Sequence, residues 1–247
     1  MPRFKDLKQR AFVESKADAG SPRRSDESES AGHIKEVRSE NNLILNEDAD
    51  IVDYFPTPEV THVDLLKSVV PSSLSQVIVL RDFFTKDEET LMLTRLYSRP
   101  WIDIKHRRLQ CYGGEPIKDA PRVQLPFFLR RLADHLRDPL GIVKFDINHA
   151  LVNEYQPGQT IHPHTDGPMY YPHVACLSLG ASAKMTFTER LPTSEVGCKE
   201  PAELLQLELP PRSLVVFSGD AYANALHGIT GVETGVRVAI TLRRILV

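Results

Sequence analysis

Apolar residues are unevenly distributed along the chain, and their spacing divides it into three parts. Residues 1–50 are rich in Ser, Glu, Lys and Arg and hold few large apolar side chains, a composition that cannot offset the entropy lost on ordering. Residues 51–76 are a Pro-rich approach segment. From Val77 onward, short apolar stretches recur between turns. We therefore expect a disordered tail, a linker and one globular domain over residues 77–247.

The first elements of this domain are a strand and two helices. Val77-Ile-Val-Leu80 is an apolar run that predicts a strand. Thr85-Lys-Asp-Glu88 is a capping box, which predicts a helix continuing through about Tyr97. An amphipathic run predicts a second helix from about 125 to 136. Short strands follow, so we expect an α+β, mainly β fold: a double-stranded β-helix, or jelly roll, with helices packed on one side.

The segment from Arg237 to Arg243 alternates as a strand with two different faces. One face carries Val238, Ile240 and Leu242, and the other carries Arg237, Ala239, Thr241 and Arg243. Six strand residues span about 20 Å, so two arginine side chains that lean towards each other leave a slot for a small dicarboxylate. The alternative is a pair of structural arginines that neighbouring carboxylates neutralise.

Two histidines and one aspartate occur in an order that suits a non-haem iron site. His164-Thr-Asp166 follows a strand-like run, and His227 follows a second predicted strand that ends at Gly219. Two imidazoles and one carboxylate form the facial triad that binds Fe(II) and leaves positions open for a co-substrate and oxygen. The sequence therefore predicts a metal site that distant segments build together.

Other interpretations of these residues stay open at the level of sequence. His62-Val-Asp64 repeats the local pattern without matching downstream partners. His162 competes with His227 for the metal, and a lone histidine beside leucine is more often a core residue than a ligand. Zinc is a rival to iron, because three protein ligands and a water also describe a catalytic zinc site.

Composition narrows the class of protein. With 247 residues and 41% apolar content, the chain can form one barrel-sized domain. A net charge of −3 gives no overall attraction to nucleic acid, so such binding requires a local basic patch. Cys111, Cys176 and Cys198 lack metal-type or disulfide spacing, and no apolar run reaches the ~18 residues of a membrane span. We expect a soluble protein of the nucleus or cytoplasm with no membrane partner.

Over about residues 77–247 the chain resembles the AlkB-like branch of the Fe(II)/2-oxoglutarate dioxygenases, and within it the subgroup of the sixth AlkB homologue. The motifs that carry the resemblance occur in the family's order. They are Arg107-Arg-Leu-Gln-Cys-Tyr-Gly-Gly114, Asn153-Glu-Tyr-Gln-Pro-Gly158, His164-Thr-Asp-Gly-Pro-Met-Tyr-Tyr-Pro172, Pro211-Arg-Ser-Leu214, Leu226-His-Gly-Ile229 and Arg237-Val-Ala-Ile-Thr-Leu-Arg-Arg244.

This resemblance implies a site and a reaction. His164, Asp166 and His227 would ligate Fe(II). Asn153, Tyr155, Arg237, Thr241 and Arg243 would bind the co-substrate 2-oxoglutarate, with Arg237 on its distal carboxylate and Arg243 near the metal-bound end. Family members often carry Asn where this chain has Ala239, so one polar contact would be absent. Oxygen would be consumed as 2-oxoglutarate becomes succinate and CO₂, and hydroxylation of an N-methyl group would release formaldehyde.

The same resemblance places a lid over the target base at residues 105–122, where five basic residues face two acidic ones. The residues expected to contact phosphates and stack a flipped base are Arg107, Arg108, Tyr112, Tyr170 and Tyr171. A solvated loop with core tyrosines is the alternative. We expect a nucleic-acid oxidative demethylase that binds its substrate through this basic lid. A protein or small-molecule hydroxylase, or a non-catalytic binding module, are the other hypotheses.

Overall fold

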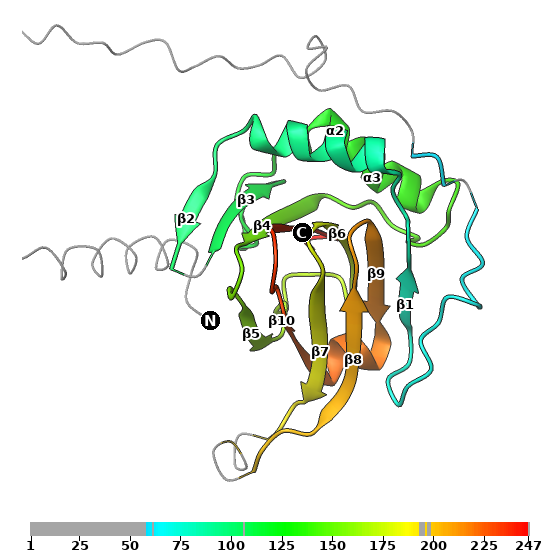
Figure 1. Cartoon of the computed structure of the whole chain (residues 1–247), viewed down its shortest axis with the longest axis vertical. Helices are drawn as coiled ribbons and strands as arrows, with labels where there is room; N and C mark the ends of the chain where they lie inside the picture. Colours follow the sequence, from blue (N-terminus) through cyan, green and yellow to red (C-terminus); the bar gives the residue numbers. More distant parts are fainter. Residues whose placement is uncertain (1–57, 61, 106, 193–195, 197–198, 247) are drawn as a thin grey trace, which may run out of the picture. The chain divides into compact units, whose positions relative to one another are not determined.

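The computed structural model describes residues 58–246, apart from 61, 106, 193–195 and 197–198. The expected disordered tail and Cys198 lie outside the described residues. The described chain consists mainly of two antiparallel sheets, with helices over one face of the larger sheet (Figure 1). None of its helices combines the length and apolar character needed to cross a membrane.

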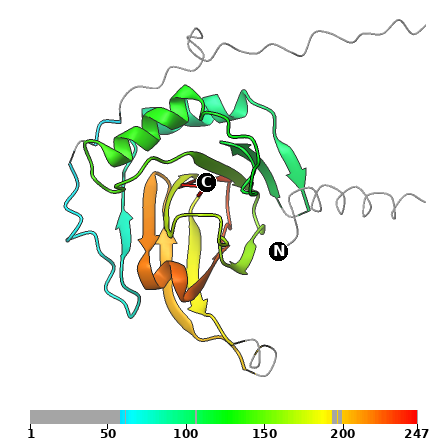
Figure 2. The same ribbon diagram turned by 180° about the vertical axis from the view of Figure 1, so that it is seen from behind.

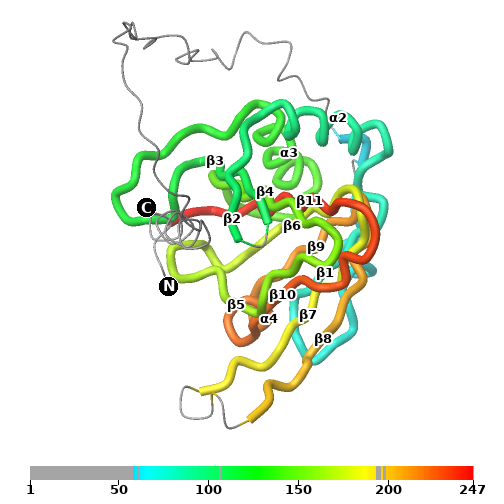
Figure 3. The backbone as a smooth tube through the Cα atoms, turned by 60° about the vertical axis from the view of Figure 1, so that its left-hand side comes forward, coloured from blue at the N-terminus to red at the C-terminus, as the bar shows by residue number. Residues whose placement is uncertain are grey.

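Seven strands form the larger sheet, and each pairs antiparallel with its neighbours. In order across the sheet they are β1 (Val77–Leu80), β9 (Ser213–Ser218), β6 (His173–Gly180), β11 (Arg237–Arg243), β4 (His149–Tyr155), β3 (Arg107–Tyr112) and β2 (Ile102–Ile104). Strand β11 lies between β6 and β4, as Figure 3 shows. The last strand of the chain is thus at the centre of the sheet.

The smaller sheet has four strands, in the order β5 (Ile161–His164), β10 (Ala225–Thr230), β7 (Ala183–Glu189) and β8 (Glu203–Leu209). An apolar core between the two sheets contains Val174 and Phe217 from the larger sheet and Met185 and Phe187 from the smaller one. Two facing antiparallel sheets with this connectivity form the expected jelly roll. The fold class that the sequence predicts is confirmed.

A second core lies on the opposite face of the larger sheet. Val152, Ile240 and Leu177 are opposite one another across β4, β11 and β6, and all three belong to this core. Because side chains alternate along a strand, the residues between them point towards the smaller sheet. The two predicted faces of β11 are confirmed, since Val238, Ile240 and Leu242 lie in the second core while the other residues line a cavity.

Helices α2 (Lys86–Tyr97) and α3 (Phe127–Arg137) cover this second core, and the reverse view in Figure 2 shows them again along one side of the sheet. The capping box predicted at the start of α2 is present. Glu88 N donates to Thr85 Oγ1 over 3.2 Å, and Thr85 N donates to Glu88 Oε2 over 2.7 Å. Two otherwise unpaired amides are therefore satisfied where the helix begins.

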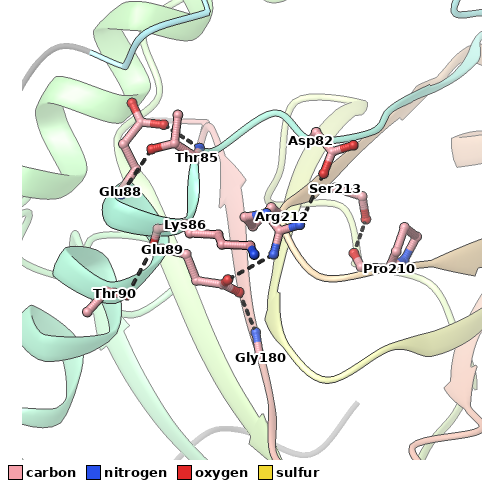
Figure 4. A network of polar contacts seen from close by, with 10 residues as sticks. All are labelled: Asp82, Thr85, Lys86, Glu88, Glu89, Thr90, Gly180, Pro210, Arg212 and Ser213. Atoms are coloured by element: carbon pink, nitrogen blue, oxygen red, sulfur yellow. Dashed lines mark hydrogen bonds and ion pairs between the residues drawn. The ribbon is translucent and has the colours of Figure 1, made fainter.

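Arg212 joins helix α2 to the loop that follows β1 (Figure 4). Its Nη1 lies 3.2 Å from Glu89 Oε2, and its Nη2 lies 3.1 Å from Asp82 Oδ1. The amide of Gly180 donates to the other oxygen of Glu89 over 2.8 Å. The two carboxylates of Asp82 and Glu89 therefore neutralise this partly buried arginine.

The structure differs from the sequence prediction at three places. Residues 107–112, expected within the lid, form β3 and pair with β4. The short loop expected before His227 contains helix α4 (Gly219–Ala223). Within the segment expected to be a linker, Leu74 is only 6% exposed and belongs to the core between the sheets. In each case, contacts with residues that are distant in the sequence determine the structure of a segment whose own residues do not predict it.

Candidate metal and co-substrate site

The two sheets bring His164, Asp166 and His227 together. His164 is the last residue of β5, and the pairing of β5 with β10 places it opposite His227. Asp166 follows two residues later in the connecting segment. One candidate ligand atom from each of the three side chains lies within 4.8 Å of the others. The register between two short strands therefore connects residues that are far apart in the sequence.

Both imidazoles are in a state that suits a metal ligand. Burial, with smaller contributions from His164 and Arg243, lowers the pKa of His227 to about 4 against an opposing effect of Asp166, so this ring is neutral near pH 7. Nδ1 of His164 lies 2.9 Å from the carbonyl oxygen of His162. A proton on Nδ1 would be donated to that carbonyl, which leaves the lone pair of Nε2 for a metal.

Asp166 has one oxygen engaged and one without a partner. Arg243 Nη1 donates to Oδ1, and both side chains are about 5% exposed or less. Oδ2 is buried and has no hydrogen-bond partner among the described residues. A buried carboxylate oxygen left in this way is costly unless a cation binds it. The donor set and this orphaned oxygen therefore fit a divalent metal.

The three residues line a cavity of about 510 Å³ between the sheets, a volume that includes space open to solvent. Its walls come from strands of both sheets. Besides the three, the lining includes Asn153, Tyr155, Cys176, Phe217, Arg237, Ala239, Thr241 and Arg243. The five residues that the family resemblance assigns to 2-oxoglutarate thus share one cavity with the candidate metal ligands.

Arg237 is the strongest indication of an anionic ligand. Its side chain is fully buried, and Nη2 donates to Ser178 Oγ over 2.9 Å. Nε and Nη1 have no hydrogen-bond partner within the described part of the chain. Its guanidinium carbon lies 5.4 Å from the centre of the Tyr155 ring. A buried cation with unused donors on Nε and Nη1 fits an anionic group such as a carboxylate.

The alternative of structurally neutralised arginines holds for one member of the pair only. Arg243 is paired with Asp166 and lies 4.1 Å from the centre of the Tyr170 ring. Arg237 is held by the neutral Ser178 hydroxyl. The two arginines therefore have different tasks: one orients a candidate metal ligand, and the other presents unused donors to the cavity.

The rival ligands lie elsewhere. His162 is exposed and is not part of the cluster of potential ligand atoms. Asp64, from the second His-x-Asp sequence, pairs with Lys67 at the surface over 3.0 Å. Neither arrangement competes with the group formed by His164, Asp166 and His227.

The residues expected to contact substrate are distributed over both faces of the larger sheet. Arg107 Nε donates to Asn153 Oδ1 over 2.9 Å, on the face of the cavity. Arg108 points the other way, because neighbouring strand residues alternate. Its Nε and Nη2 donate to Glu154 over 2.6 and 2.7 Å. Arg108 is thus part of a structural ion pair beneath the helices.

The three tyrosines are also in different surroundings. Tyr112 packs edge-on against Phe128 of α3, with 6.3 Å between ring centres, and so belongs to the helix side. Tyr170 is 7% exposed and lies beside Arg243, close to the metal cluster. Tyr171 is 41% exposed, but its ring packs at a tilt against Phe145, with 4.5 Å between ring centres. The structure does not gather the predicted substrate residues into one surface.

Sequence reasoning missed two residues of the site. Ser178 orients Arg237, and Phe217 lies 4.9 Å from the ring of His227. Both belong to strands that read as continuous apolar runs. Alternation along such a run assigns Ser178 to one of the two faces of its strand. The sequence does not show that this strand pairs with the strand of Arg237, so the contact between the two residues could not be predicted.

Comparison with known proteins agrees with this geometry. The family model described as the 2OG-Fe(II) oxygenase superfamily matches residues 76–243. The protein named "Probable RNA/DNA demethylase ALKBH6" from Danio rerio is 32% identical over 202 residues, which cover 74% of this chain and 86% of that protein. The tRNA (carboxymethyluridine(34)-5-O)-methyltransferase alkbh8 of Xenopus tropicalis is 30% identical over 185 residues, or 67% of this chain and 27% of that protein.

A solved structure supports the fold. The structure of OsALKBH1 superposes with a TM-score of 0.53 at 13% identity, covering 68% of this chain and 98% of that one. At this identity the likeness concerns the arrangement of sheets and helices alone.

Proposed function

The chain belongs to the 2OG-Fe(II) oxygenase superfamily, and from this premise we propose that it is an AlkB-like oxidative demethylase of methylated nucleic acid. Enzymes of this superfamily use Fe(II), 2-oxoglutarate and oxygen. The observation that carries the proposal is one cavity in which two histidines and an aspartate converge beside a buried arginine with free donors.

In this proposal His164, Asp166 and His227 hold Fe(II). The neutral ring of His227 and the free Oδ2 of Asp166 supply lone pairs. Arg243 binds the other oxygen of Asp166 and so orients that carboxylate. Three protein ligands would leave further positions on the metal for a co-substrate and oxygen from the cavity.

Arg237 would bind the distal carboxylate of 2-oxoglutarate through its unused donors. Asn153, Tyr155 and Thr241 line the same cavity and contact the rest of the molecule. When bound, iron, 2-oxoglutarate and oxygen would together supply oxidising chemistry, in which one oxygen atom hydroxylates a C–H bond and the other enters succinate as CO₂ is released. The protein positions the target carbon and keeps water from the buried part of the site.

The class of substrate is inferred from the relatives and from chemistry. A hydroxylated N-methyl group breaks down to formaldehyde and a free amine, so hydroxylation alone completes a demethylation. The names of the Danio rerio and Xenopus tropicalis relatives refer to RNA or DNA substrates. The overall charge of −3 means that affinity for a phosphate backbone must come from local basic residues. We place this enzyme in the nucleus or cytoplasm, where its substrate would be available.

The test is a screen of N-methylated single-stranded oligonucleotides and methylated peptides for formaldehyde release that depends on Fe(II) and 2-oxoglutarate. We expect release from an oligonucleotide by the wild-type protein and none by His164→Ala. Release from peptides alone would replace the substrate class with that of a protein demethylase. A wild-type protein that forms no succinate with any substrate would reject the proposal.

A further inference from the structure

We propose that Arg107 is a positioning residue for 2-oxoglutarate, which acts by fixing the orientation of the Asn153 amide. This inference rests on the function proposed above, because it deepens the description of the co-substrate site. Arg107 thereby takes a different role from the contact with nucleic-acid phosphate that its sequence motif suggested.

The hydrogen bond between the two residues determines which end of the amide faces the cavity. A guanidinium has donors and no acceptor, so Arg107 Nε, at 2.9 Å, meets Oδ1 of Asn153 and not its amide nitrogen. Asn153 is 4% exposed and lines the cavity. With Oδ1 engaged by Arg107, the NH₂ group is the end that remains to donate to a carboxylate.

Loss of Arg107 would remove this selection. An asparagine amide is nearly symmetric in shape, and a rotation of about 180° exchanges its donor and acceptor ends. The rotated amide presents oxygen to the cavity, where it would repel a carboxylate. A fixed amide thus favours the bound dianion before the ligand arrives.

Neighbouring contacts set Arg107 apart from a purely structural arginine. Arg108, the next residue, is neutralised by Glu154 on the helix side. Arg107 instead bonds a neutral amide on the cavity side, near Tyr155. Burial raises the pKa of Tyr155, and the charges of Arg237 and Arg107 act against that rise. Arg107 therefore lies among residues assigned to the co-substrate.

The experiment measures the Kd of 2-oxoglutarate by calorimetry on the Fe(II)-loaded protein without oxygen. We expect Arg107→Met to weaken binding about tenfold, with partial recovery in Arg107→Lys, whose ammonium also donates. Fe(II) affinity should stay unchanged. Arg81→Met is the charge-matched control, because Arg81 is exposed and follows β1 at the opposite edge of the sheet.

A double-mutant cycle with Asn153→Ala decides the mechanism. If Arg107 acts through the amide, Arg107→Met adds nothing to the loss already caused by Asn153→Ala. An equal additional loss in that background, reduced by salt, would show direct attraction by charge and overturn the inference. Wild-type affinity in Arg107→Met would overturn it as well. A wild-type protein that does not bind 2-oxoglutarate would instead remove the proposed function itself.

Discussion

Replacing Arg237 by methionine should stabilise the ligand-free protein while it weakens the binding of 2-oxoglutarate. The side chain is fully buried, and two of its donors have no partner among the described residues. An unsatisfied buried donor costs about 1–3 kcal/mol. Methionine keeps an unbranched apolar chain against Tyr155, although Ser178 loses its contact. We expect a net gain of about 2 kcal/mol in the free energy of unfolding.

The same substitution removes the donors for the distal carboxylate. Hydrogen bonds to charged groups contribute about 1.5–3 kcal/mol each. The loss of two corresponds to at least about 3 kcal/mol, or roughly a 150-fold higher Kd at 1.4 kcal/mol per decade. Stability and affinity are thus expected to change in opposite directions.

Urea denaturation with and without 2-oxoglutarate, together with calorimetric titration, measures both quantities. Arg212→Met is the matched control, because Arg212 is neutralised by Asp82 and Glu89 (Figure 4). That variant should lose stability and keep its affinity for 2-oxoglutarate. The reasoning is refuted if Arg237→Met destabilises the ligand-free protein as much as the control does, or if it binds 2-oxoglutarate as the wild type does.

Three further predictions concern the fold and the ligand set. Burial would raise the pKa of Glu154, but hydrogen bonds from Arg108, Tyr97 and Gln156 outweigh it and lower that pKa below 4.5. The ionised Glu154 side chain therefore stabilises the protein above pH 4.5, and this stabilisation is lost as the pH falls below that value. Glu154→Gln should lower the free energy of unfolding at pH 7 by about 2 kcal/mol, a figure reduced for the partial exposure of Arg108. Urea denaturation across pH should also show a smaller loss of stability towards acid in this variant than in the wild type. An equal loss in both proteins would contradict this prediction. Thr85→Ala removes the capping box and should destabilise the protein by about 1 kcal/mol. Urea denaturation at pH 7 measures this loss, and an unchanged free energy of unfolding would contradict it. His162→Ala should keep Fe(II) affinity within about twofold, whereas His164→Ala should lose it at least about 100-fold; comparable losses in equilibrium metal titrations would restore His162 as a ligand.

The sequence predicted the elements whose signals are local. The capping box of Thr85 and Glu88 depends on four consecutive residues, and the faces of β11 depend on simple alternation. Both could be read without knowing any neighbour. The prediction that the face with Arg237 and Arg243 lines the site was correct for the same reason, because it depended only on alternation and on the two charged residues.

What could not be predicted depends on the pairing of strands. Arg107 and Arg108 are adjacent, so one basic pair in the sequence indicated one basic surface. Pairing of β3 with β4 places Arg108 opposite Glu154 and gives it a structural partner. Replacing both arginines at once would therefore break the ion pair beneath the helices as well as the contact with Asn153, and single replacements are needed to separate the two effects.

The position of Arg237 explains how the fold tolerates a buried cation without a carboxylate partner. Strand β11 pairs with β4 on one side and β6 on the other. Its helix-side residues Val238, Ile240 and Leu242 anchor it in the second core. The backbone of Arg237 is thus held by contacts that do not depend on its side chain, so the unpaired donors cannot relax towards solvent. That constraint keeps the guanidinium positioned for a carboxylate. For the same reason, removal of the unpaired donors in Arg237→Met should raise the free energy of unfolding without rearranging the strand.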